Sequence, residues 1–371
     1  MKRVLFMPLM LGLMGISILS SCKKEPASTT GFDNEESRVR TEANQAVSEK
    51  TARAQAYEKE FDQLYQAELG RTNRNLVELA SSIPTFKSLV AAVVKTGLAP
   101  VLATPNLNAT VFAPNDAAFA KLPAPFNNPA NISGITDQAQ IDGLRNILLY
   151  HVLGSKVLRN QVAPGRSSAV TLKPAGSSND NTIYFSNSLG LLLVNGNSLV
   201  LRANVLANNG VIHVIDDVLL PPTQNIAEIA IGNPAFSSLV AALVKTNLAS
   251  VFTGAGDFTV FAPTDAAFAQ LPAPFNNAAN ISNITDPAQI SALSNILRYH
   301  VTGSRYFAWD LGLFRSVTTL ADGSRNKLTT VLGLNFGFVK GNQNPSFARI
   351  NPANILATNG VIQVVDKVLL P

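Results

Sequence analysis

The sequence is poor in the side chains that most enzymes use for bond chemistry. Its 371 residues include one cysteine and three histidines, and only 14% of the residues are charged. With Cys22 alone, an intrachain disulfide is excluded. The sequence also lacks the GxSxG, GxGxxG, HExxH and CxxC patterns that mark nucleophiles, phosphate loops and zinc sites. We therefore predict a protein that is not an enzyme and that uses no metal or other cofactor.

Positive charge is present but is not concentrated. The chain carries 29 Lys and Arg against 24 Asp and Glu, for a net charge of +5. No block of basic residues occurs, and no basic stripe alternates with aromatic residues, as a nucleic-acid surface would require. We predict no nucleic-acid partner.

The N-terminal segment has the features of an export signal. Two basic residues at 2–3 precede an apolar run over 4–19, and the sequence LSSC follows at 19–22. This arrangement resembles a bacterial lipoprotein signal, which implies cleavage after residue 21 and a lipid anchor on Cys22. The alternative is an ordinary signal peptide with an incidental cysteine. No Asp follows Cys22, so we expect the outer membrane of the cell envelope.

The next seventy residues divide into two parts. Residues 22–40 are polar, contain Pro, Gly and Ser, and predict a flexible tether. Residues 41–70 are rich in Ala, Glu and Gln and lack Pro, so they predict a helical stalk or a helix packed on the domain that follows; a coiled-coil oligomerisation helix is an alternative. Its expected apolar stripe consists of Val47, Ala54, Tyr57, Phe61, Leu64 and Tyr65.

The rest of the chain consists of two copies of one sequence unit. Residues 110–137 and 259–286 differ at only four of 28 positions, and other segments repeat at the same offset of about 150 residues. A repeat of this length is a duplicated domain rather than a solenoid unit. In each copy helical periodicity comes first and short strands follow, which predicts an α+β fold. The first helix should bury Phe86, Leu89, Val90, Val93 and Val94, or their second-copy equivalents Phe236, Leu239, Val240, Leu243 and Val244.

Three ordered motifs occur in both copies. They are TVFAPxDAAF at 110–119 and 259–268, a Tyr-His pair at 150–151 and 299–300, and a closing block at 209–221 and 359–371. Each unit resembles a fasciclin (FAS1) domain. The resemblance implies two tandem domains, residues 71–222 and 223–371, each a β-wedge or sandwich flanked by several short helices. The second copy departs from the pattern at Gln363, where the first has His213.

The resemblance also indicates candidate site residues. The Tyr-His region of animal fasciclin proteins is implicated in integrin recognition, so Tyr150, His151, Tyr299 and His300 are possible partner-binding residues. The alternative is that the histidines are core residues bonded to backbone. Trp309, the single tryptophan, is either a platform for a sugar ring or a hydrophobic plug.

Together these features predict an envelope-anchored, non-catalytic adhesion or interaction protein. Its partners would be the membrane, through the lipid on Cys22, and a protein or polysaccharide at the cell surface. The alternative function is a surface lipoprotein that captures carbohydrate or another small ligand for uptake. The sequence does not define an oligomeric state.

Overall fold

The computed structural model describes residues 32–69, 73–176, 179–324, 326–332 and 336–371. The predicted signal over 1–21 and the predicted lipidation site at Cys22 lie outside these residues. Within them, no single helix is long and apolar enough to cross a bilayer. Only the helices at Ile226–Gly232 and Pro234–Lys245 reach that length and composition together, and they are bent by 101° relative to each other.

A long helix, α1 (Phe32–Leu69), precedes two domains with the same order of elements. The helical elements of the first domain are α2 (Leu76–Ser81), η1 (Pro84–Phe86), α3 (Lys87–Lys95), α4 (Ala99–Leu102), α5 (Asp116–Phe119), α6 (Pro129–Ser133), α7 (Gln138–Tyr150) and η2 (Arg159–Gln161). Those of the second are α8 (Ile226–Gly232), η3 (Pro234–Phe236), α9 (Ser237–Lys245), η4 (Ala249–Phe252), α10 (Asp265–Phe268), α11 (Ala278–Ser282), α12 (Pro287–Tyr299) and η5 (Ala308–Leu311).

Each domain contains one mixed sheet. The first has the order β2-β1-β7-β6-β5-β4-β3, and the second has β10-β11-β12-β13-β15-β8-β9, with β14 paired to β15. The strands of the first sheet are β1 (Ala109–Pro114), β2 (Val152–Leu153), β3 (Gly165–Val170), β4 (Thr182–Ser188), β5 (Leu191–Val194), β6 (Ser198–Ala207) and β7 (Gly210–Ile215). The second set is β8 (Phe258–Pro263), β9 (Val301–Thr302), β10 (Arg315–Thr318), β11 (Lys327–Leu332), β12 (Gly337–Lys340), β13 (Ala348–Ile350), β14 (Ile355–Ala357) and β15 (Gly360–Val365).

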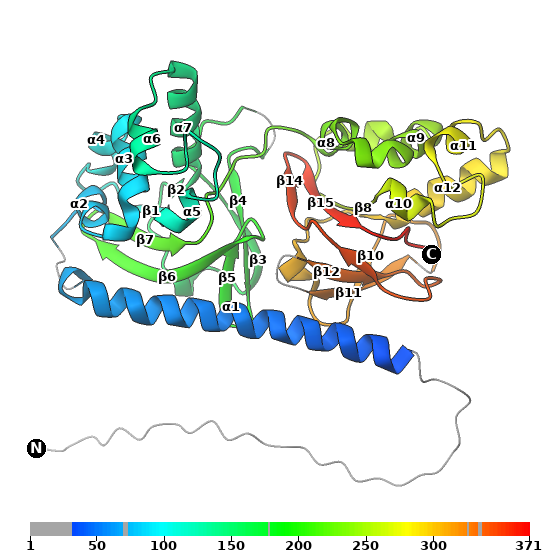
Figure 1. Cartoon of the computed structure of the whole chain (residues 1–371), viewed down its shortest axis with the longest axis horizontal. Coiled ribbons are helices and arrows are strands. Elements are labelled where there is room, and N and C mark those ends of the chain that lie inside the picture. Colours follow the sequence, from blue (N-terminus) through cyan, green and yellow to red (C-terminus); the bar gives the residue numbers. More distant parts are fainter. Residues whose placement is uncertain (1–31, 70–72, 177–178, 325, 333–335) are drawn as a thin grey trace, which may run out of the picture.

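The predicted α+β class is confirmed, and the two closing motifs explain the topology. The first and last motifs of each domain form a parallel pair at the centre of the sheet, β1 with β7 and β8 with β15. In that register Phe112 lies opposite His213, and Phe261 opposite Gln363. Helices lie above the sheets and α1 lies below them (Figure 1).

Short polar residues begin several helices of both domains. The side chains of Asn115 and Thr264 accept hydrogen bonds from the third residue beyond, as N-caps do. The neighbouring carboxylates Asp116 and Asp265 accept from the backbone amides at the start of α3 and α9, both at 2.7 Å. These motif residues therefore hold helices in place.

The first helix of each domain departs from its predicted face at one position. Phe86, Leu89 and Val93 are buried as expected, and Val90 is half-buried. Val94 and its equivalent Val244 are 64% and 69% exposed, so the prediction that they are buried was wrong. The helix ends one residue later, and the chain turns away through a left-handed residue, which leaves nothing to cover them.

The helix α1 starts earlier than the sequence suggested. It begins at Phe32, so the predicted tether over 22–40 was wrong from residue 32 onward. Polar residues that weaken an isolated helix are tolerated there because the helix packs on the protein. Figure 1 shows α1 running beneath both domains, with its first turns under the second domain and its last turns under the first.

The buried face of α1 joins the two domains in one apolar cluster, the α1 seam. It comprises Val39 and Ala43 of α1, Leu191, Leu193, Leu199 and Leu201 of the first domain, and Trp309, Val331, Leu332, Phe338 and Phe347 of the second. Phe61 and Tyr65 pack instead into the core of the first domain, whereas Leu64 is 64% exposed and was predicted wrongly.

Direct contacts between the domains reinforce the α1 seam. The Arg166 guanidinium donates to the backbone oxygen of Arg305 at 2.6 Å and lies 3.9 Å from the centre of the Tyr306 ring. The Asn354 amide donates to Asn197 Oδ1 at 2.8 Å. Because α1 packs against both domains and side chains pair directly between them, the two domains form one continuous body.

We expect Ala43→Glu to lower the free energy of unfolding by about 3 kcal/mol, because Ala43 is fully buried and a carboxylate there has no partner in the α1 seam. The released end of α1 should become sensitive to trypsin at Arg38 and Arg40. Urea unfolding and limited proteolysis measure the two effects. The matched control is Asn44→Glu on the exposed face; equal loss in both variants would contradict the packing of α1.

Candidate functional site

The residues singled out from the sequence lie in the cores of the domains. Tyr150, His151, Tyr299, His300 and Trp309 are each at most 1% exposed. A side chain without surface cannot contact a partner unless the domain opens. The structure therefore does not support these five residues as a partner-binding surface, and it agrees with the interpretation that they are core residues.

Both Tyr-His histidines are neutral and fully used. Nδ1 of His151 lies 2.7 Å from the backbone oxygen of Ile147, and Nε2 accepts from the Leu219 amide at 2.8 Å. His300 has the same partners in the second domain, Ile296 and Leu369. Because an amide can only donate, the proton must reside on Nδ1. Burial lowers the pKa of each imidazole to about 4.

The tyrosines of the pairs tie the helices to the sheets. The Tyr150 hydroxyl donates to the backbone oxygen of Thr182 at 2.7 Å and accepts from the Asn195 amide at 3.1 Å. The Tyr299 hydroxyl donates to Lys327 at 2.6 Å. Burial raises the pKa of both hydroxyls. These contacts assign the Tyr-His motif a structural role in each domain.

The difference between His213 and Gln363 confirms that this position needs hydrogen bonds rather than a titratable group. Nδ1 of His213 accepts from the Asn204 amide at 3.2 Å, and Nε2 faces the Val157 oxygen at 2.9 Å. In the second domain, Gln363 Oε1 accepts from the Asn354 amide at 2.9 Å, and Nε2 donates to Tyr306 at 3.0 Å. The primary amide thus supplies a hydrogen-bond donor and an acceptor in the places where the neutral imidazole supplies them.

The remaining candidates for chemistry are also occupied. Trp309 packs in the α1 seam as a plug, so it offers no face to a sugar. Asp216 accepts from the Leu199 amide at 2.6 Å and pairs with Arg53 of α1 at 2.9 Å, while burial raises its pKa. Its counterpart Asp366 accepts from the Arg349 amide. Among the described residues, no group of three or more His, Cys, Asp or Glu side chains is placed to hold a metal ion.

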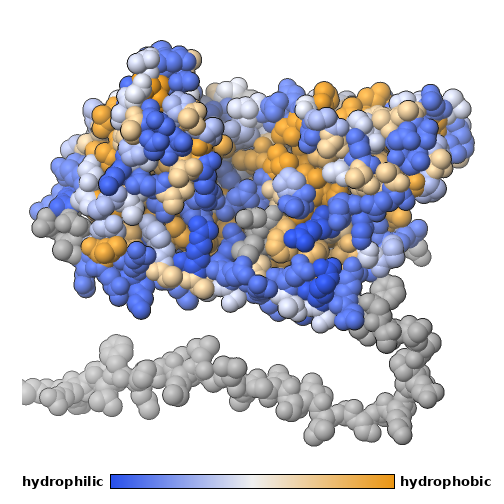
Figure 2. Space-filling model, viewed as in Figure 1, coloured by the Kyte–Doolittle hydropathy of each residue, from blue (hydrophilic) through white to orange (hydrophobic). Residues whose placement is uncertain are grey.

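A cleft between the domains has a volume of about 800 Å³. The second domain contributes an apolar wall that includes Ile229, Ile355 and Leu356, and the first domain adds Leu122 and Val218. Figure 2 shows apolar side chains gathered on that side of the hollow. The opposite wall carries the ion pair of Lys121 with Asp217, at 2.5 Å. The linker between the domains completes the lining.

Amide side chains line the bottom of this interdomain cleft. Asn195, Asn197, Asn351 and Asn354 all contribute, and Asn354 is held by its bond to Asn197. Within the described strands, β14 pairs only with β15, so its second edge carries no strand. The sequence analysis missed this site, because its residues come from segments up to 238 positions apart, from Ala118 to Leu356, and share no motif.

The fold and these sites define a class: a tandem pair of α+β modules whose repeated motifs maintain shape. The family model for the fasciclin domain matches residues 84–221 and 234–371. The chain therefore belongs to the fasciclin domain family, as the motifs indicated. Fasciclin domains are found in cell adhesion proteins, which supports an adhesion or interaction role.

Relatives occur in animals and bacteria. Transforming growth factor-beta-induced protein ig-h3 of Sus scrofa is 31% identical over 262 residues, which cover 71% of this chain and 34% of that protein. Protein sll1483 of Synechocystis is 32% identical over 160 residues, covering 43% of this chain and 79% of that protein. The chain thus spans about a third of the length of the pig relative. A solved FAS1 domain pair from the insect cell adhesion molecule fasciclin I is 17% identical, with a TM-score of 0.37, and the match covers 77% of this chain and 97% of that one.

We expect His213→Gln to change stability at pH 7 by less than about 1 kcal/mol, because Gln363 shows that an amide satisfies the same partners. Burial lowers the pKa of His213 in the folded protein, so below pH 6.5 the unfolded chain binds the extra proton. Stability must then fall as the pH falls. The variant lacks this contribution and should lose less stability than the parent between pH 7 and pH 5 in urea unfolding.

The control is His213→Leu, which also removes the titration. It leaves the Asn204 amide and the Val157 oxygen without their partner and should cost about 2 kcal/mol at pH 7. Equal stability of the Leu and Gln variants at pH 7 would show that the two hydrogen bonds do not matter.

Proposed function

We propose that this protein is a non-catalytic adhesion or interaction protein of the cell envelope, and that it holds its partner in the interdomain cleft. The observation that carries the proposal is the cleft itself, a large mixed polar and apolar surface to which both domains contribute. Recognition by such a surface needs no bond-making group. The buried imidazoles and carboxylates described above are already bonded within the fold, which is consistent with this role.

The lining favours an extended protein segment as the partner. None of the described residues that line the cleft is aromatic, so the cleft offers no ring for a sugar to stack on. The second edge of β14 can pair with an added strand, and Ile355 and Leu356 beside it provide apolar contact. The carbohydrate-capture alternative relied on Trp309, which is buried, and no other observation favours it.

The anchor is the second part of the proposal. The LSSC sequence at 19–22 supports a lipid on Cys22, and hydrocarbon contributes about 0.8 kcal/mol per buried CH₂ to membrane binding. A lipid at this end, in the outer membrane, would hold both domains near the surface of the cell envelope.

We expect Leu356→Asp to reduce adhesion at least fivefold without unfolding the protein, because it places a charge on the half-buried apolar wall of the cleft. Beads coated with the protein would be applied to immobilised envelope protein, envelope polysaccharide and whole cells. The control is Val244→Asp, an apolar residue that is 69% exposed and does not line the cleft. Adhesion that survives Leu356→Asp, or that occurs only on polysaccharide, would rule out a protein segment in the cleft.

Cys22→Ala should move the protein from the membrane fraction to the soluble fraction and remove acyl mass from the mature N-terminus. Cell fractionation and mass spectrometry measure the two changes. Ser28→Ala, in the same segment, should leave the distribution unchanged. A parent protein whose N-terminus carries no acyl group would refute the anchor and leave the binding proposal intact.

A further inference from the structure

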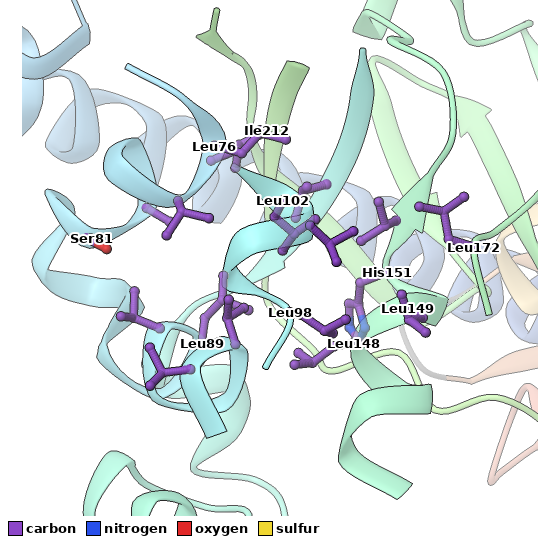
Figure 3. A pocket seen from close by; sticks show the side chains of 18 residues that line it. Leu76, Ser81, Leu89, Leu98, Leu102, Leu148, Leu149, His151, Leu172 and Ile212 are labelled. Atoms are coloured by element: carbon purple, nitrogen blue, oxygen red, sulfur yellow. The ribbon is translucent and has the colours of Figure 1, made fainter. Parts of the chain in front are cut away.

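The first domain contains an apolar cavity that no motif accounts for. It has a volume of about 70 Å³ and lies between α2, α3, α4 and α7 on one side and the sheet on the other. In Figure 3 the side chains of Leu89, Leu102 and Leu148 point into it. The lining residues are aliphatic except Ser81 and His151.

The buried polar group in this wall, the His151 imidazole, is already bonded, and Ser81 is exposed. Both ring nitrogens of His151 have backbone partners, so the imidazole offers the cavity only carbon. A sugar or a peptide amide entering the cavity would lose its bonds to water and gain none. The cavity therefore selects for hydrocarbon.

The cavity opens at a patch of exposed aliphatic side chains. Val94, Val101 and Leu172 all line it and are 64%, 47% and 38% exposed. Val94 is the residue that helical periodicity predicted to be buried. Apolar side chains grouped at the mouth of an apolar cavity extend its apolar surface. They can cover the part of a hydrocarbon ligand that the cavity itself does not hold.

One cation lies beside this mouth. Arg145 is exposed and precedes the lining residues Leu148 and Leu149 by one turn of α7. Its Nη2 lies 3.7 Å from the position that a Cβ on Gly97 would take, next to the lining residue Leu98. Arg145 forms no hydrogen bond or ion pair with any residue in the described part of the chain, so its charge is available to an anion.

The equivalent region of the second domain differs in both features. Phe252 stands in place of Leu102 and packs against Phe258, with ring centres 6.1 Å apart. The corresponding cavity, which is lined by His300, is reduced to about 20 Å³. Ser294 stands in place of Arg145. A separate pocket of about 290 Å³ at equivalent positions is lined by Leu248, Val251, Phe252 and Arg298, so the two copies of the fold differ in the shape of this region.

We propose that the first domain binds a single-chain anionic amphiphile, a fatty acid, with the end of its alkyl chain in the cavity and its carboxylate at Arg145. The cavity is about half the volume of an engineered cavity of roughly 150 Å³ that admits benzene, so it takes the narrow tip of a chain. The rest of the chain lies along Val94 and Val101. This site is separate from the interdomain cleft and does not depend on the proposed adhesion role.

The test uses residues 23–371, which omit the lipidation site at Cys22, so that no lipid is attached and no detergent is needed. Decanoate and 1-decanol have the same alkyl chain and differ in head-group charge. Calorimetric titration should show one equivalent of decanoate bound. Leu102→Phe, which copies the second domain, should weaken both ligands at least tenfold.

Arg145→Glu should weaken decanoate about tenfold and change decanol less than twofold, because only decanoate has a charge to pair with the guanidinium. The matched control is Ser294→Glu, which places the same charge at the equivalent position of the second domain and should alter neither ligand. Val94→Asp, an exposed substitution at the mouth, tests the cavity without disturbing the core.

Three results would overturn the proposal. They are the absence of saturable binding of decanoate, binding that persists in both Leu102→Phe and Val94→Asp, and an equal loss of decanoate and decanol in Arg145→Glu. Since none of these variants lines the interdomain cleft, adhesion in the bead assay is expected to remain unchanged in all of them.

Discussion

The arrangement of this protein depends on apolar burial beneath one helix. Val39 and Ala43 of α1 are fully buried in a cluster whose other members come from both domains. Neither domain can bury its own share alone, because the α1 seam exists only where the two meet. The position of each wall of the interdomain cleft therefore follows from a helix that lies on the opposite side of the sheets.

Inside each domain, polar positions are maintained by hydrogen-bond geometry and not by charge. His213 and Gln363 bond to the same kind of backbone partners with different functional groups. His151 and His300 remain neutral because burial disfavours the charged imidazolium form. A neutral imidazole and a primary amide both combine one donor with one acceptor. The histidines that recur in the motifs of both domains therefore maintain the fold.

Much of this could be predicted from the sequence, for local reasons. Caps such as Asn115 follow from residue type, and the α+β class follows from helical periodicity that precedes short strands. What failed was what depends on distant neighbours: the true start of α1 and the exposure of Leu64 and Val94. Each is decided by whether another segment covers the residue. Neither the cleft nor the apolar cavity has a signature in any single stretch of sequence.

The direction of α1 has a consequence for how the molecule would stand on a bilayer. The helix has 38 residues and is about 57 Å long, and its first turns lie under the second domain. A chain anchored to the membrane at its N-terminus would therefore keep the second domain closest to the lipid and the first domain farther from it. Height above the bilayer would run opposite to the order of translation, and the half of the molecule most exposed to the surroundings would be the one that contains the apolar cavity.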